Sequence, residues 1–303
     1  SVKKGKEDEL DKKWIVTCHP PRVPLPTEVC KGAMLEIMDT EMGQPRVTSA
    51  LMLTHSKSKN KPIENWELIS AIYGKRGNND HPVVELGPSR VYFANNKGSC
   101  MLNPQQTEAV ERYCSGTSPA FVVEAPPSSG KTMTSAAMAV NYKGPGVQLF
   151  LSTANVPVIN MDLALAKLDI GSLKPIHFIS SEREELMTEE TRSPFTAMSL
   201  AKKCEHLNEE ITFLERQLKY APNDEEREKL RAAIRKVSLH VYAEKYDIFF
   251  ATVDMILGRL FKSNQAGKHQ VDHIKKQLMT GVRRIVVDEA SQLTEAALNA
   301  IIL

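Results

Sequence analysis

From Leu102 onward, short apolar runs alternate with segments in which apolar residues recur at helical spacing. This alternation is typical of βαβ units, in which helices join parallel strands and cover the sheet. The pattern therefore predicts an α/β domain over residues 101–303. The predicted strands are Ala120–Glu124, Val147–Ser152, Ile176–Ile179, Asp247–Thr252 and Arg284–Asp288, and the predicted helices are Lys131–Asn141, Val156–Lys167, Val253–Lys262 and Gln292–Ile301.

One segment, from about residue 180 to residue 245, interrupts the alternation. Its apolar residues recur three and four positions apart in two stretches, which predicts two helices that each bury a narrow seam. Between them, Pro222 supplies a stop, and Asn223 or Asp224 a helix N-cap. We expect an antiparallel helical hairpin inserted into the α/β domain, with its charges on a solvated face; docking of a partner is the less favoured alternative. The two seams are Leu200, Cys204, Leu207, Ile211, Leu214 and Leu218, and Leu230, Ile234, Val237 and Val241.

Residues 1–100 have a different pattern of apolar and polar positions. Short apolar runs such as Val47–Leu53 and Val91–Phe93 are separated by breaks rich in proline, glycine or asparagine. Short β-branched runs punctuated in this way favour strands over helices. The first 100 residues are therefore predicted to form a small β-rich subdomain.

Composition and charge exclude several classes of protein. The 303 residues are 42% hydrophobic and 25% charged, with a net charge of +2, so a polyanion would have to be held by a local groove. The five cysteines are scattered and odd in number, which argues against a disulfide framework or a zinc site and favours a reducing compartment. The sequence contains neither a signal peptide nor an apolar stretch of about 20 residues. We expect a soluble protein of the cytoplasm or nucleus that has no membrane partner.

The segment Ala125–Thr132 reads Ala-Pro-Pro-Ser-Ser-Gly-Lys-Thr and lies between a predicted strand and a predicted helix. A loop in this position directs backbone N–H groups and the positive end of the helix dipole at a phosphate. Gly130 would let the backbone approach the phosphates, Lys131 would reach the β- and γ-phosphates, and Thr132 would bind Mg²⁺. The segment therefore predicts a P-loop that binds ATP.

Two positions of this loop depart from the usual pattern. Ala125 replaces the first glycine, and Ser128 stands where many such loops carry another glycine. An added methyl group is small and a serine hydroxyl still donates hydrogen bonds, so nucleotide binding is expected to survive, with weaker binding as an alternative.

A second motif separates the candidate classes of P-loop protein. The apolar strand before it ends in two adjacent acids, Asp288 and Glu289, at the strand end where ligands of α/β proteins bind. Asp288 is suited to hold Mg²⁺ through its water shell, and Glu289 to orient or deprotonate the attacking water. An acidic helix N-terminus that complements the helix dipole is the minor alternative.

These residues resemble those of the superfamily 1 helicases of the nonsense-decay and senataxin type. The likeness covers about residues 102–170 and 247–303, and its motifs occur in the family's order. They are Leu102–Val110, similar to the adenine-recognising segment; Ala125–Thr132, with Pro126 and Pro127 in place; Ser152–Asn160, similar to a segment beside single-stranded nucleic acid; Phe249–Thr252, similar to a strand ending in Ala-Thr; and Asp288–Gln292, similar to the second acidic motif.

The resemblance implies a RecA-like parallel sheet flanked by helices, and a role for each matching residue. Lys131 and Glu289 would be catalytic, and Thr132 and Asp288 would hold Mg²⁺. Single-stranded nucleic acid would contact Thr153, Asn155 and Thr252. ATP would contact Gln106, through its base, together with Pro127, Ser128, Ser129, Gly130, Lys131, Thr132 and Gln292. The hairpin and the β-rich start match, by position alone, a helical subdomain and a small barrel of the family.

The expected function is that of an ATP-dependent helicase or translocase on single-stranded nucleic acid, with RNA favoured over DNA. The serine start and the apolar end favour a fragment of a longer chain, whose second RecA-like domain would supply arginines to the γ-phosphate. The fragment alone is not expected to unwind a duplex. Two alternatives stay open: a hydrolysis-impaired scaffold that binds RNA or protein partners, and a P-loop ATPase unrelated to nucleic acid.

Overall fold

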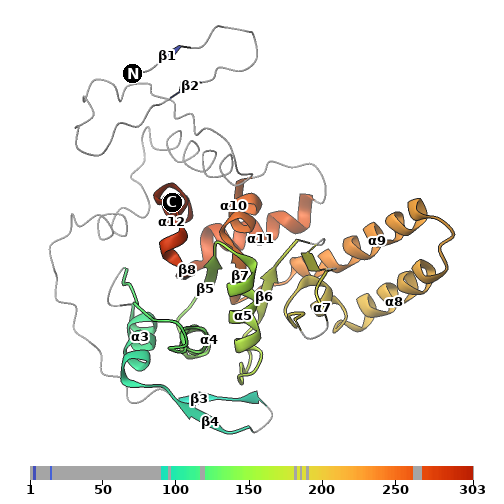
Figure 1. Cartoon of the computed structure of the whole chain (residues 1–303). Coiled ribbons are helices and arrows are strands. Elements are labelled where there is room, and N and C mark those ends of the chain that lie inside the picture. Colours follow the sequence, from blue (N-terminus) through green and yellow to red (C-terminus); the bar gives the residue numbers. More distant parts are fainter. Residues whose placement is uncertain are drawn as a thin grey trace.

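The structure is a computed structural model that describes residues 3–4, 14–15, 90–94, 97–116, 120–180, 183–184, 186–188, 191–261 and 268–302 (Figure 1). Most of residues 1–100, including Val47–Leu53, lie outside this range, and with them most of the predicted β-rich subdomain. Of that part of the chain, the structure describes two antiparallel strand pairs, β1 with β2 and β3 with β4.

From residue 104 onward, each described strand is followed in the chain by one or more helices. The strands are β1 (Lys3–Lys4), β2 (Trp14–Ile15), β3 (Arg90–Tyr92), β4 (Ser99–Met101), β5 (Val147–Ser152), β6 (Pro175–Phe178), β7 (Ile248–Thr252) and β8 (Val282–Asp288). The helices are α3 (Pro104–Ser115), α4 (Lys131–Asn141), α5 (Asn155–Leu165), α7 (Ala197–Ala201), α8 (Glu205–Tyr220), α9 (Asp224–Ser238), α10 (Val253–Phe261), α11 (Lys268–Gly281) and α12 (Glu295–Ile302).

The chain has an α/β fold, as the sequence predicts. Within the described residues, four strands form one parallel sheet in the order β6-β7-β5-β8, with helices on its faces. Parallel strands covered on both faces carry continuous apolar sequence, and β5 and β7 are buried along their whole length. In register, Ser152 pairs with Thr252 on β7 and with Asp288 on β8, so the ends of the three strands lie side by side.

Alternate side chains of the strands build two cores, one on each face of the sheet. Leu149 and Leu151 join a core with helices α7 to α12, whereas Phe150 faces the opposite core with α3, α4 and α5. Phe150 is stacked against Phe250 of the neighbouring strand, with ring centroids 5.3 Å apart. Burial of each such ring stabilises the fold by about 1.5–3 kcal/mol, and together they hold α4 on the sheet.

The predicted strand Ala120–Glu124 is wrong. Residues 120–126 adopt no regular structure, and Val122 and Val123 are 90% and 50% exposed. A β-branched sequence forms a strand only where a neighbouring strand completes its hydrogen bonds. Among the described residues, β8 pairs with β5 alone, and no strand pairs with Ala120–Glu124.

Several predicted helices differ from the structure at their ends. The first seam does not lie on one long helix, because α7 ends at Ala201 and α8 begins after Cys204. The Cys204 side chain makes no capping hydrogen bond. The second helix starts as predicted after Asn223, whose side chain accepts a hydrogen bond from Glu226 N. Its last predicted seam residue, Val241, lies in a following 3₁₀ helix.

Helices α8 and α9 pack against each other and project from the sheet (Figure 1). In chain order they lie between β6 and β7. The buried residues Leu207, Ile211, Ile234 and Val237 join their inner faces to the core. Among the described residues, no helix combines the length and the apolar character that crossing a bilayer requires.

A buried polar cluster lies between α5 and the edge strand β6. Asp162 and His177 are 0% and 1% exposed, and the Asp162 carboxylate is hydrogen-bonded to Nδ1 of His177. His177 N also donates to Phe195 O at 2.8 Å, which attaches the segment after β6 to the sheet edge. Buried polar atoms that lack a partner, Asp162 Oδ1, His177 Nε2 and Glu184 Oε1, belong to this cluster.

We expect Glu184→Gln to stabilise the fold at neutral pH. Burial raises the pKa of Glu184 above its ordinary value of 4.5, and this effect outweighs the hydrogen bond from Thr196 and the charge of Arg192, which lower the pKa. Folding thus strengthens proton binding, so stability falls as pH rises from 4.5 through the folded-state pKa. Thermal unfolding should show a higher Tm for the variant at pH 7 and equal values below pH 4.5. Equal values throughout would contradict the prediction.

Candidate functional site

The loop before α4 forms a tight turn that ends in the first residues of the helix. Ser129 N donates to Pro126 O at 3.2 Å, and Gly130 caps α4 in the left-handed region with φ 85°. The helix N-terminus is therefore where the sequence places it, with Lys131 and Thr132 as the first helical residues. The strand predicted before the loop does not form, because the described residues 120–126 have no regular structure. Of the predicted strand–loop–helix arrangement, only the loop and the helix are present.

Ser128 also lies in the left-handed region, with φ 62°. This conformation explains the preference of such loops for glycine, because it costs an L-residue about 1–2 kcal/mol. Ser128 and Pro127 are exposed at the tip of the turn, whereas the Ser129 hydroxyl is buried without a hydrogen-bond partner. The substitution that the sequence singles out therefore strains the loop.

Gln106 is joined directly to this loop. Its side chain completes a capping box with Asn103 at the start of α3, and its Nε2 donates to Ser129 O at 2.9 Å. The far end of α3 is fixed to the sheet, since Arg284 Nε of β8 donates to Tyr113 O at 2.8 Å. The predicted base-binding residue thus lies beside the predicted phosphate loop.

Lys131 and Glu289 meet across the site. Lys131 Nζ donates to Glu289 Oε1 at 3.0 Å, although the two residues are 158 positions apart in sequence. Glu289 follows β8 directly with φ 55°, and its backbone N–H donates to Asp288 Oδ1 at 3.0 Å. In this state the carboxylate predicted to activate water is occupied by the lysine predicted to hold phosphate.

The charges of the site reinforce one another. The hydrogen bond to Glu289 is the largest cause that raises the pKa of Lys131, and the negative charges of Glu289 and Asp288 raise it further. Lys131 therefore stays protonated throughout the physiological pH range, as a phosphate-binding cation must. A phosphate group would compete with Glu289 for this ammonium group.

A second pair joins the acidic turn to β5. Thr153 Oγ1 donates to Gln292 Oε1 at 2.9 Å. The sequence predicts Gln292 as the first residue of a helix, Gln292–Ile301. In the structure it is instead the last residue of a 3₁₀ turn, Ala290–Gln292, that precedes α12. The short turn arises because Gln292 N donates to Glu289 O, which closes the chain one residue earlier than an α-helix would.

The other residues predicted to contact nucleic acid have different environments. Asn155 is the first residue of α5, next to Thr153, and is partly exposed. Thr252 ends β7 but is only 7% exposed, and its hydroxyl accepts a hydrogen bond from Met255 N at 3.4 Å. Thr153 and Asn155, two positions apart in the chain, are therefore both partly exposed, whereas Thr252 is buried.

The residues present fit a nucleotide with Mg²⁺. A Cβ at Gly130 would lie 2.6 Å from Gln106 Nε2, so only glycine leaves the loop in its present form. Among the described residues, no three His, Cys, Asp or Glu side chains gather as a metal site. Mg²⁺ usually takes one or two protein ligands together with phosphate oxygens and waters, so Thr132 and Asp288 suffice as the protein's share.

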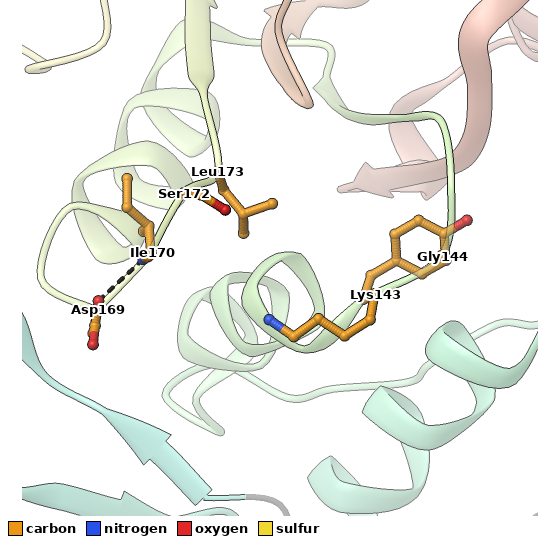
Figure 2. A pocket seen from close by; sticks show the side chains of 8 residues that line it. Lys143, Gly144, Asp169, Ile170, Ser172 and Leu173 are labelled. Carbon is orange, nitrogen blue, oxygen red and sulfur yellow. Dashed lines mark hydrogen bonds between the residues drawn. The ribbon is translucent and has the colours of Figure 1, made fainter.

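A cavity of about 440 Å³ lies elsewhere, between the α4–β5 and α5–β6 loops (Figure 2). Lys143, Asp169 and Ser172 are among its lining residues, and Asp169 Oδ1 accepts a hydrogen bond from Gly171 N. Both loops precede their strands, so the cavity is at the opposite end of the sheet from Asp288. Ligands of α/β proteins bind at the carboxyl ends of strands, and the candidate site is therefore the one around Lys131.

Sequence reasoning missed the two contacts that connect the motifs, from Gln106 to Ser129 and from Thr153 to Gln292. The capping sequence Asn-Pro-Gln-Gln signals the start of α3, but no local pattern predicts which loop the glutamine reaches.

In comparisons with known proteins, no family model matches the chain, and no curated protein matches it.

Proposed function

We propose that this chain is the ATP-binding motor module of a superfamily 1 helicase of the nonsense-decay and senataxin type, acting on single-stranded nucleic acid, with RNA favoured over DNA. The finer fold assignment, a RecA-like P-loop domain with an inserted helical hairpin and a β-rich N-terminal subdomain, is part of this proposal. So is the dependence of hydrolysis on a second RecA-like domain of a longer chain.

The observation that carries the proposal is the contact between Lys131 and Glu289. Two motifs that the sequence separates by more than half of the chain meet at 3.0 Å, at the carboxyl end of a parallel sheet. An isolated Lys-Thr pair or an isolated Asp-Glu pair arises often by chance. Their convergence at the N-terminus of α4 supports a common role in phosphoryl chemistry.

Each residue has a task that its position permits. Gln106 orients the base from its place beside the loop, and Gly130 and the first N–H groups of α4 receive the phosphates. Lys131 leaves Glu289 for the γ-phosphate, which frees the Glu289 carboxylate to accept a proton from water. Bound Mg²⁺ would neutralise phosphate charge. Thr153 and Asn155 hold the strand together with Thr252, which is the least accessible of the three because only 7% of it is exposed.

Lys131→Ala is the test of this proposal. Removal of the ammonium group should abolish detectable binding of a fluorescent ATP analogue in the presence of Mg²⁺, and any nucleic-acid-stimulated hydrolysis, because no other described side chain provides a cation at this point of the loop. Lys143→Ala is the matched control, since Lys143 follows the other end of α4 and its one hydrogen bond to a described residue is to Val140 O. Equal affinity in the Lys131 variant and the wild type would reject the proposal.

A second candidate function, a hydrolysis-impaired scaffold that binds RNA or protein partners, draws on the strained Ser128. In this candidate, strain in the loop has a small effect on binding of the nucleotide. It has a larger effect on the closed loop geometry that hydrolysis requires. In the longer chain that includes the second RecA-like domain, nucleotide binding without turnover, with turnover appearing in Ser128→Gly, would favour the scaffold. Turnover in the wild type on addition of a single strand would exclude it.

A further inference from the structure

Helix α3 is fixed at both ends, and each end contacts a different part of the molecule. At its start, Gln106 Oε1 accepts a hydrogen bond from Asn103 N at 2.9 Å, and Gln106 Nε2 donates to Ser129 O at 2.9 Å. At its other end, Tyr113 O accepts a hydrogen bond from Arg284 Nε of β8 at 2.8 Å. The helix therefore connects the predicted phosphate loop to strand β8.

The Arg284 guanidinium group lies against the C-terminal ends of α3 and α4. Its Cζ is 4.9 Å from the ring centroid of Tyr142, the residue that caps the end of α4. A Cβ at Gly116, which caps the end of α3 with φ 64°, would lie 2.1 Å from Arg284 Nη2. A cation at this position also complements the negative end of the helix dipole. Arg284 therefore fixes the place where α3 ends.

The neighbouring strand attaches the same end of α3 a second time. Tyr113 Oη donates to Gln148 Oε1 at 2.9 Å, and Gln148 Nε2 donates to Ala139 O of α4 at 3.0 Å. Gln148 lies on β5, directly beside Arg284 in the register of the sheet. Tyr113 and Gln148 are buried, so a shift of this helix end would leave buried polar atoms without partners. These contacts hold α3 at one axial position.

The axial position of α3 determines which way the Gln106 amide faces. Both of its polar atoms are engaged, Oε1 with Asn103 N and Nε2 with Ser129 O, so the amide cannot turn over. One N–H of Nε2 and one lone pair of Oε1 remain for a ligand. They match adenine, which offers an N6 donor beside the N7 acceptor, whereas guanine offers two acceptors, O6 and N7. A shift of α3 that breaks the bond to Ser129 O would let the amide rotate and lose this distinction.

We propose that Arg284 is a positioning residue that sets the preference of the site for ATP over GTP through α3. Arg284 does not reach the nucleotide, because Asp288, at the carboxyl end of β8, lies four residues further along the strand, about 13 Å away. Its guanidinium group fixes the end of α3, and the helix, about 18 Å long, carries that constraint to Gln106. The inference rests on the proposed function and adds a determinant of its base specificity.

The test measures the affinities of the intact chain for N-methylanthraniloyl-ATP and N-methylanthraniloyl-GTP with Mg²⁺ and takes the ratio of the two. Arg284→Met keeps an unbranched apolar stem and removes the donors. The preference for ATP should fall about three- to tenfold, the effect of one misplaced hydrogen bond. Partial unfolding cannot produce this result, because it lowers both apparent affinities by the same factor.

The neighbouring arginine provides the matched control. Arg283 is exposed, and its side chain donates to Val282 O of the same strand. Arg283→Met removes the same charge one residue away from Arg284 and should keep the wild-type ratio.

Two further variants show whether Arg284 acts through Gln106. Gln106→Ala should lose the preference for ATP, and Arg284→Met added to it should lower the ratio no further, because residues that act through one another are not additive. Gly116→Ala disturbs the same contact from the helix side, since its methyl group would displace Arg284 Nη2, and it should lower the ratio as Arg284→Met does. This second route keeps the test decisive if Arg284→Met does not fold.

Three results would overturn the inference and leave the proposed function standing. The first is a wild-type chain that binds the two nucleotides equally well. The second is an Arg284→Met variant that keeps the wild-type ratio, whether or not both affinities fall, because Arg284 is then only structural. The third is a double variant in which the two losses of preference add. A wild-type chain that binds nucleotide no better than Lys131→Ala would overturn the proposed function itself, and with it this inference.

Discussion

Gly130→Ala is expected to lower the affinity of the chain for ATP about 30- to 140-fold. The residue caps α4 at φ 85°, where an added Cβ costs about 1–2 kcal/mol, and that Cβ would lie 2.6 Å from Gln106 Nε2. Gln106 must then give up its hydrogen bond to Ser129 O, at a cost of about 1 kcal/mol. Because each 1.4 kcal/mol corresponds to about a factor of ten, these losses give the expected range.

The measurement is a titration with a fluorescent ATP analogue in the presence of Mg²⁺. Ser128→Gly provides a control of opposite sign, since glycine adopts the left-handed conformation of this position without strain and should tighten binding about two- to fivefold. If the two substitutions, two residues apart, shift the affinity for ATP in opposite directions, the backbone conformation of the loop controls nucleotide binding. Weaker binding in Ser128→Gly, or unchanged binding in Gly130→Ala, would contradict this account.

Asp162→Ala is expected to destabilise the fold by about 3 kcal/mol or more. The substitution leaves Nδ1 of His177 without its partner, and His177 is only 1% exposed. A buried polar group that loses its partner keeps the free-energy cost of its desolvation without the hydrogen bond that offsets it. Because His177 N also holds Phe195 O, the loss should loosen the segment after β6. Urea unfolding followed by circular dichroism measures the free energy.

The double variant Asp162→Leu/His177→Phe is the matched control. It replaces both polar partners by apolar side chains, which removes the unpaired group and is often neutral in a packed core. The double variant should therefore be more stable than Asp162→Ala. If it is instead less stable by the sum of two single losses, packing and not pairing accounts for the effect.

Some elements could be predicted from local sequence because local physics decides them. The helix Lys131–Asn141 coincides with α4, and Asn223 caps α9 through its own side chain. The buried strands β5 and β7 follow continuous apolar runs, the pattern of parallel strands covered on both faces. Likewise, the positive end of α4 and the acids at the end of β8, Asp288 and Glu289, are predicted from the sequence as candidate ligands of phosphate, metal and water.

Other features could not be predicted, because they depend on partners that are distant in sequence. Ala120–Glu124 has the composition of a strand but forms none, since pairing and not propensity makes a strand. Thr252 matches a segment that is expected to contact nucleic acid, yet it is only 7% exposed at the end of β7.

The sequence alone determined the α/β class and the glycine at the N-terminus of α4, because each follows from composition and spacing within a few residues. The candidate ligands stay predictions, and part of them rests on the resemblance to a known family. Only the tertiary structure decided that Lys131 meets Glu289 and that Thr153 meets Gln292. Sheet order and register bring these pairs together, and both depend on long-range contacts for which a single sequence carries no local signal.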